Sequence, residues 1–276
     1  MPDNWIDRLL HAMRFTRGKG TQGKEGCWMV LLAQFHDGKW TDQCSCVDPP
    51  INALGIVVND TLSTAHRAEI ITAFGMFDPM HTAGDAEATE RRRWHLVDAA
   101  VRIWAADALE FSDMHNHAAK LRALPKVTRD NFACVAKAAY EAACAAGEGN
   151  IVVRLASRAA AAASNAAAAA NANIYNERFD DAEWAAAAAS AAASAAASAA
   201  TSVANVANVA HRDVIDFIRV SDDGGDQYIV ERVLPVLREL IEMGPHAPRE
   251  VAPEPCISRA EVARNMGCAD LVASVV

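Results

Sequence analysis

Hydrophobic residues recur at intervals of three and four positions along the first half of the chain, which is the spacing of amphipathic helices. The most regular stretch runs from 87 to 111, where Trp94, Val97, Val101 and Trp104 share one stripe. A stripe of this width predicts a long helix at the centre of a core. Alternating apolar and polar positions, which indicate strands, are nearly absent, so we predict an all-α fold without a sheet.

Capping and turn-forming residues divide this half of the chain into separate helices. Asp48 followed by Pro49 and Pro50 predicts a helix start, because aspartate can accept hydrogen bonds from the free first amides and proline suits the first turn. The stretch RFTRGKGTQGKEG (14–26) is too rich in glycine and lysine for a helix and is expected to be a loop. The predicted helices cover 3–15, segments starting near 27, at 49 and at 63, and then 87–111, 113–124 and 129–146.

Alanine dominates the chain beyond residue 150. Two segments, 151–172 and 182–220, are dense in alanine, which has the highest helix propensity of all residues. We therefore predict two helices that pair as a hairpin. Serine recurs every four residues from Ser190 to Ser202, so small side chains line one helical face and allow another helix to approach closely.

The C-terminal part is predicted to hold two more helices. Residues 226–243 are amphipathic with a kink at Pro235, the proline-rich linker GPHAPREVAPEP follows, and Ser258 with Glu261 has the spacing of a capping box. The overall prediction is an all-α multi-helix bundle with a long alanine-rich helical hairpin and a tethered C-terminal helix. Its expected parts are an N-terminal helical domain (1–149), the hairpin plus the following helix (150–243), and the linker with the C-terminal helix (244–276).

Charge and cysteine usage narrow the class of protein. The 276 residues carry a net charge of -9, which argues against general nucleic-acid binding because phosphate contacts need a basic face. The alanine-rich run has almost no Leu, Ile or Phe, so we expect no membrane-spanning segment. Seven cysteines without a paired framework, and an N-terminus without the apolar core of a signal peptide, predict a reducing, cytoplasmic location.

A glycine-rich segment of the predicted loop offers a ligand-binding pattern. Residues 18–23 match G-x-G-x-x-G, but no strand precedes them, so a dinucleotide fingerprint is excluded. The segment nevertheless runs into a helix start, whose free amides could bind an anion. Arginines that face this loop would complete a phosphate-binding pocket; otherwise the loop is flexible and the arginines face solvent. The candidate residues of this pocket are Lys19, Lys24, Arg91, Arg92 and Arg93.

Cys27 is the candidate nucleophile. A thiol in the first turn of a helix has its thiolate favoured by the helix dipole and by nearby lysine. A cysteine hydrolase also needs a histidine, and the sequence does not rank the four candidates. These are His36, His66, His81 and His95. The alternative is a buried structural cysteine.

Asn59, Asp60 and Arg67 lie between two predicted helices and are further candidate ligand-binding residues. Asp60 could cap the second helix while Arg67 reaches back to pair with it, which would make a structural corner.

Cys44-Ser45-Cys46 contains metal-ligand residue types, as do Asp42, Asp48 and Cys27 nearby. A single C-x-C pair without a second well-spaced pair is not a zinc signature. The sequence therefore predicts no metal site, and it indicates no cofactor.

Three stretches, GCWMVLLAQFHDG, CVDPPINALGIVVNDTLSTAHRAEI and RRRWHLVDAAVRIWAADAL, carry a resemblance. Together with the alanine-rich helices they resemble a group of phage and bacterial proteins with an N-terminal cysteine helix, an Asn-Asp corner and an alanine-rich tail. The likeness covers residues 26–205. It implies a helical fold and a phage setting, and it transfers no catalytic residue.

Two classes of function stay open at this point. The first is a non-enzymatic, phage-encoded helical protein that sequesters an anionic small ligand, a nucleotide or phosphate, or engages a partner protein, and that forms a homo-oligomer. The second is a cysteine-dependent hydrolase or nucleotide-processing enzyme that uses Cys27 and the glycine-rich loop. Convergence of Cys27, a histidine and the loop in one pocket would favour the enzyme.

Overall fold

The computed structural model describes residues 14–22, 25–111, 113–146 and 223–244, together with Ser258, Glu261, Val262 and Arg264. The predicted alanine-rich hairpin, its serine stripe and the proline-rich linker after Gly244 lie outside the described residues, as do residues 3–13 of the first predicted helix. The last two residues of that predicted helix, Arg14 and Phe15, form a strand instead.

The described chain is mostly helical, which confirms the fold class predicted from the periodicity. A helix starts one residue after Cys27 and another directly after Asp48, as expected. The elements are β1 (Arg14–Phe15), β2 (Glu25–Gly26), α2 (Trp28–Asp37), α3 (Pro49–Thr61), α4 (Arg67–Phe74), α5 (Ala86–Ala99), η1 (Ala100–Ala105), α6 (Ala106–Glu110), α7 (His115–Ala123), α8 (Phe132–Ala146), α11 (Asp223–Tyr228), η3 (Ile229–Val233) and α12 (Leu234–Glu242).

The expectation of no sheet at all is wrong in one place. β1 and β2 pair in parallel, with Arg14 opposite Glu25 and Phe15 opposite Gly26. Gly20, between them, has a positive φ of 62°, and a Cβ there would lie 2.3 Å from the Glu25 carbonyl oxygen. Glycine therefore permits this close return of the chain. Strands of two residues are too short to show an alternating pattern.

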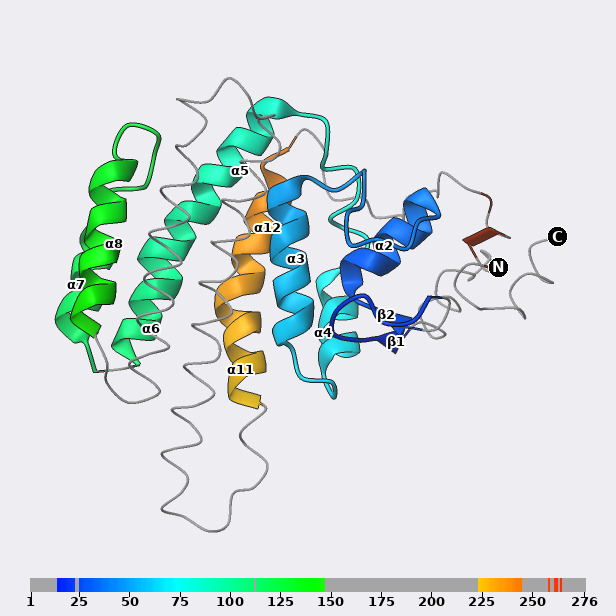
Figure 1. Cartoon of the computed structure of the whole chain (residues 1–276), viewed down its shortest axis with the longest axis horizontal. Coiled ribbons are helices and arrows are strands. Elements are labelled where there is room, and N and C mark those ends of the chain that lie inside the picture. Colours follow the sequence, from blue (N-terminus) through cyan, green and yellow to red (C-terminus); the bar gives the residue numbers. More distant parts are fainter. Residues whose placement is uncertain are drawn as a thin grey trace, which may run out of the picture.

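The predicted central helix is confirmed as one continuous rod. α5 passes directly into the π-helical segment η1 and then into α6, and Trp104 and Val97 are fully buried along it. Figure 1 shows this rod between α7 and α8 on one side and α3 and α12 on the other. No helix among the described residues is both long and apolar enough to cross a membrane.

The late helix α12 packs against α3 and α5, so residues 223–244 share the hydrophobic core of the N-terminal region. Leu237 and Leu240 are fully buried there. The irregularity predicted at Pro235 takes the form of the π-helical segment η3 just before it, consistent with a proline that cannot donate a backbone hydrogen bond.

The capping interaction predicted for the last helix is present. The Ser258 hydroxyl oxygen accepts a hydrogen bond from the Glu261 amide at 3.2 Å. Val262, one residue on, is fully buried and belongs to the hydrophobic core, so at least this apolar side chain is docked.

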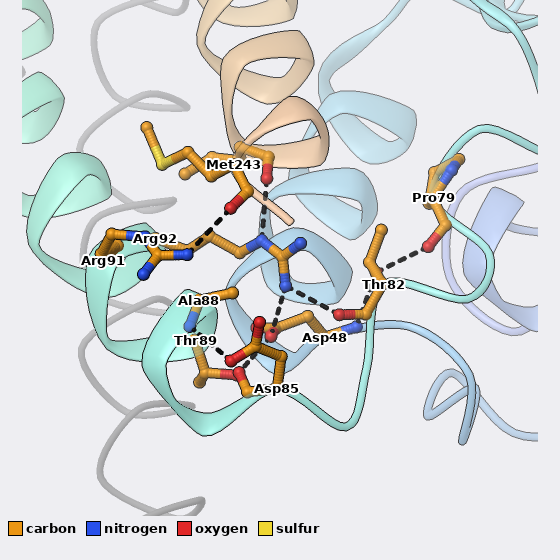
Figure 2. A network of polar contacts seen from close by, with 10 residues as sticks. Asp48, Pro79, Thr82, Asp85, Ala88, Thr89, Arg91, Arg92 and Met243 are labelled. Atoms are coloured by element: carbon orange, nitrogen blue, oxygen red, sulfur yellow. Dashed lines mark hydrogen bonds and ion pairs between the residues drawn. The ribbon is translucent and has the colours of Figure 1, made fainter. Parts of the chain in front are cut away.

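A buried ion pair between Arg92 and Asp48 joins several elements (Figure 2). Both side chains are 0 % exposed, and the Arg92 Nη1 to Asp48 Oδ2 distance is 2.8 Å. The same guanidinium donates to the carbonyl oxygens of Thr82, at 2.7 Å, and Leu240, at 2.8 Å. One side chain therefore ties the start of α3, the loop before α5 and the end of α12 together.

Asp48 precedes α3 as predicted, but its side chain does not cap that helix. Its Oδ2 instead accepts from Arg92 and from the Thr89 hydroxyl, both on α5. The Asp48 amide donates to the Thr82 hydroxyl oxygen at 3.0 Å, which fixes the loop before α5 as well. Pairing with a buried cation has replaced the predicted capping role.

Substitution of Arg92 by alanine should remove about 3–5 kcal/mol from the free energy of unfolding, because it leaves the Asp48 carboxylate buried without its partner. The matched variant Arg91→Ala removes an exposed arginine paired with exposed Glu87 and should cost about 1 kcal/mol or less. Urea denaturation followed by circular dichroism measures both values. Similar small losses in the two variants would contradict a dominant role for the buried pair.

Candidate functional site

The glycine-rich loop is fastened to the end of α3 by Asn59 and Asp60. The Gly18 backbone amide donates to Asp60 Oδ1 at 3.0 Å, and the Asn59 side-chain Nδ2 donates to the Thr16 carbonyl oxygen at 2.8 Å. Asn59 Oδ1 also accepts from the Trp28 amide at 3.1 Å, at the start of α2. The corner predicted from the sequence is thus the anchor of the loop and of the next helix.

These contacts occupy groups that an anion would need. The Gly18 amide is bound to the Asp60 carboxylate, and the Cys27 amide donates to the Gly18 carbonyl oxygen at 3.0 Å. Lys19 lies 3.7 Å from Asp42, which offsets its charge. A phosphate at the described part of this loop would meet two carboxylates, so the geometry does not support the predicted anion site there. Lys24 lies outside the described residues.

Arg67 does not pair with Asp60 as predicted. Its buried guanidinium donates to the carbonyl oxygens of Asn59, at 2.7 Å, and Leu62, at 2.6 Å. These carbonyls lie at the C-terminal end of α3, where helices leave acceptors without intrahelical donors and where a cation is favourable. Arg67, the first residue of α4, therefore satisfies carbonyl groups at the C-terminal end of α3.

The three consecutive arginines do not share one environment. Arg92 lies in the buried ion pair, Arg93 is 7 % exposed and pairs with Glu90, and only Arg91 is exposed. Successive positions on a helix point about 100° apart, so the three side chains cannot face one site together. Figure 1 also places the β1–β2 region, which carries Lys19, away from the start of α5. The described residues do not form the predicted joint pocket.

Arg91 instead borders a groove of about 300 Å³ between α5, the loop from α7 to α8, and the end of α12. Trp94, Val127 and Met243 supply its apolar lining, and two further cations of the loop flank it. The lining residues are Glu90, Arg91, Trp94, His95, Lys126, Val127, Thr128, Arg129 and Met243.

The loop that carries Lys126 and Arg129 has an ordered backbone. Asp98 Oδ1 accepts from the Val127 amide at 2.9 Å, and the Asn131 side chain bonds both the Thr128 amide and the Lys126 carbonyl oxygen at 2.9 Å. Glu90, the acidic residue of the groove, is already engaged, because it accepts from the Trp94 indole at 2.6 Å and pairs with Arg93. The sequence does not reveal this site because Arg91 is distant along the chain from Lys126 and Arg129.

A second cluster consists of His36, Cys44 and Cys46. Their ligand atoms all lie within 4.8 Å of one another and all three residues are buried, with the two sulfur atoms 3.2 Å apart. The sequence indicates the C-x-C pair as possible metal ligands, but together with Asp42, Asp48 and Cys27. It offers His36 only as a possible catalytic partner of Cys27. The short segment between the end of α2 at Asp37 and Cys44 is the sequence feature that could have indicated that His36 lies near the C-x-C pair.

Asp37 links the two halves of this cluster. Its carboxylate accepts from the Ser45 amide at 2.9 Å and the Ser45 hydroxyl at 2.6 Å, and Oδ1 lies 2.7 Å from His36 Nδ1. Burial alone would raise the pKa of Asp37, but these hydrogen bonds lower it below its usual value. The hydrogen bond between the two thiols lowers the pKa of Cys46 and raises that of Cys44.

Cys27 lies at the predicted helix start, but its thiol is only 2 % exposed. Burial raises its pKa to about 11, which is opposite to the expected direction, because desolvation of the thiolate outweighs the hydrogen bonds from the first amides of α2. Three of the candidate histidines contact carboxylates: His36 that of Asp37, His66 that of Asp226 and His95 that of Glu239.

Alkylation with iodoacetamide at about pH 8 should leave Cys27 unmodified while Cys134 and Cys144 react. Both of these thiols are exposed on α8, whereas Cys27 is buried and its raised pKa lowers the thiolate fraction roughly 100-fold. Peptide mapping by mass spectrometry measures each site in the folded protein. Labelling of Cys27 as fast as Cys134 would restore it as a candidate nucleophile.

Compared with protein-family models, with curated proteins and with solved structures, the chain gave no match. The function therefore has to be argued from the residues and their geometry.

Proposed function

We propose that the protein is a non-enzymatic binding protein that holds an anionic small molecule with a flat ring, such as a nucleotide, in the groove beside Trp94. The observation that carries the proposal is the combination of Arg91, Lys126 and Arg129 around an apolar, aromatic lining. Cationic side chains form strong charge-assisted hydrogen bonds with phosphate, and an aromatic ring can stack on a base.

The electrostatic setting supports an anion over a neutral ligand. The chain as a whole has a net charge of -9, so a local group of three cations stands out from the average field. Glu90 opposes them less than its charge suggests, since its oxygens are bound to Arg93 and to the Trp94 indole. Arg91 itself is paired with Glu87 and donates to the Met243 carbonyl oxygen, so the proposal relies mainly on the charges of Lys126 and Arg129.

The size and backbone of the groove also suit a small ligand. Its volume of about 300 Å³ lies at the lower end of the range for small-molecule sites. Hydrogen bonds from Asp98 and Asn131 hold the loop of Lys126 and Arg129, so binding orders few additional backbone groups.

The enzymatic alternative receives less support from the geometry. A cysteine nucleophile acts as the thiolate, and the buried Cys27 has a pKa of about 11. The homo-oligomeric state, the phage setting, the cytoplasmic location and engagement of a partner protein stay predictions from the sequence.

Calorimetric titration with a nucleoside triphosphate and with inorganic phosphate tests the proposal. We expect the nucleotide to bind the wild-type protein, and the Lys126→Ala, Arg129→Ala double variant to bind it at least about 10-fold more weakly, because two charge-assisted contacts are lost. Trp94→Leu should weaken nucleotide binding more than phosphate binding.

Lys137→Ala is the matched control, since it removes an exposed lysine of α8 that does not line the groove. It should bind as the wild-type protein does. Equal affinities of the wild type and the double variant, or no binding of the nucleotide to the wild type, would contradict the proposal.

A further inference from the structure

The cluster of His36, Cys44 and Cys46 gathers three soft or borderline ligand atoms in a buried corner between the end of α2 and the loop before α3. All three atoms lie within 4.8 Å of one another. We propose that this cluster is a binding site for a thiophilic divalent cation, zinc. The site is separate from the Trp94 groove and does not depend on the ligand-binding function proposed for it.

The ligand types favour zinc among the common divalent cations. Two thiolates and an imidazole suit zinc, whereas magnesium and calcium prefer oxygen ligands. Binding transfers two thiol protons to the buffer and leaves two thiolate charges against the doubly charged cation, so the buried site becomes neutral. Three protein ligands leave one tetrahedral position for a water molecule or another ligand.

The cluster has an outer layer of hydrogen bonds suited to a metal site. The contact between His36 Nδ1 and Asp37 Oδ1, at 2.7 Å, favours a proton on Nδ1, so that Nε2 would be the nitrogen that binds the metal. Metal-bound histidines usually donate the N–H of their other ring nitrogen to a carboxylate, a backbone carbonyl or a water molecule. The Asp37 carboxylate also holds Ser45, between the two cysteines, so one side chain orients both halves of the site.

The turn that carries the two thiols is held on both sides. The Val47 amide donates to the Cys44 carbonyl oxygen at 3.1 Å, and the Ala83 amide donates to the Cys46 carbonyl oxygen at 3.2 Å. Asp48, two residues after Cys46, is paired with Arg92. With Zn–S bonds of about 2.3 Å the sulfurs would be about 3.8 Å apart, so zinc requires only a small opening of their 3.2 Å separation.

Titration of the reduced, chelator-treated wild-type protein with Co²⁺, followed by competition with Zn²⁺, tests the site. We expect one equivalent to bind with the thiolate-to-cobalt absorption band, and zinc to displace it. The Cys44→Ser, Cys46→Ser double variant should lose the band. The matched control Cys134→Ser, Cys144→Ser removes two exposed thiols of α8 and should keep it.

Asp37→Asn is the positioning variant, because it removes the carboxylate but no proposed ligand. It should keep the one-to-one stoichiometry and bind zinc about 10- to 100-fold more weakly. Circular dichroism checks that each variant is folded. If the double cysteine variant does not fold, the weakened zinc binding of the folded Asp37→Asn variant assigns the metal to this cluster, and unchanged binding by that variant overturns the proposal.

A folded, reduced wild type without the thiolate-to-cobalt band would overturn the proposal. So would an equal band in the wild type and the double cysteine variant, which would place the metal on other thiols. Formation of a Cys44–Cys46 disulfide in the presence of reductant and zinc would likewise overturn it. Nucleotide titration of the same samples tests the groove separately.

Discussion

The buried ion pair of Arg92 and Asp48 is the constraint on which both candidate sites depend. Removing two charges from water is costly, and hydrogen bonds from the guanidinium to the carbonyl oxygens of Thr82 and Leu240 offset only part of that cost, since burial still raises the pKa of Asp48. Cys46 lies two residues before Asp48, and Met243 lies three residues after Leu240. The same contacts therefore position the turn of the thiol cluster and one wall of the Trp94 groove.

Local sequence patterns predict the helices of this chain, but they do not predict its long-range polar contacts. The stripe through Trp94 and Trp104 identifies the rod of α5, η1 and α6 because burial of one helical face repeats along the sequence. The hydrogen-bond partners of the Asp48 side chain leave no such repeating pattern in the sequence. Its partner Arg92 lies 44 positions away, so a residue placed correctly at a helix start was given the wrong role.

The candidate site shows the same division between local and tertiary information. The sequence predicts a corner at Asn59–Asp60 but not its contacts, because Asp60 binds the Gly18 amide and Arg67 binds carbonyl oxygens. It also groups three adjacent arginines, although helix geometry separates their side chains. For Cys27, the sequence leaves open a thiolate favoured by the helix start and a buried structural cysteine, and the burial that raises its pKa supports the second. The contact of His36 with the C-x-C pair needed the path of the chain after α2, which residue spacing alone does not provide.

The two sites differ in the kind of chemistry that their surroundings allow. The groove is bordered by exposed cations on an otherwise acidic protein, so it can attract a diffusing anion through water. The thiol cluster is buried, and a cation there gains from a low dielectric only if both thiols give up their protons. A metal at the cluster would thus act mainly by clamping the end of α2 to the 44–48 turn. Arg92 binds both that turn, through Asp48, and the end of α12, through Leu240. A metal at the cluster would therefore stabilise elements that also form the groove, without being part of the groove itself.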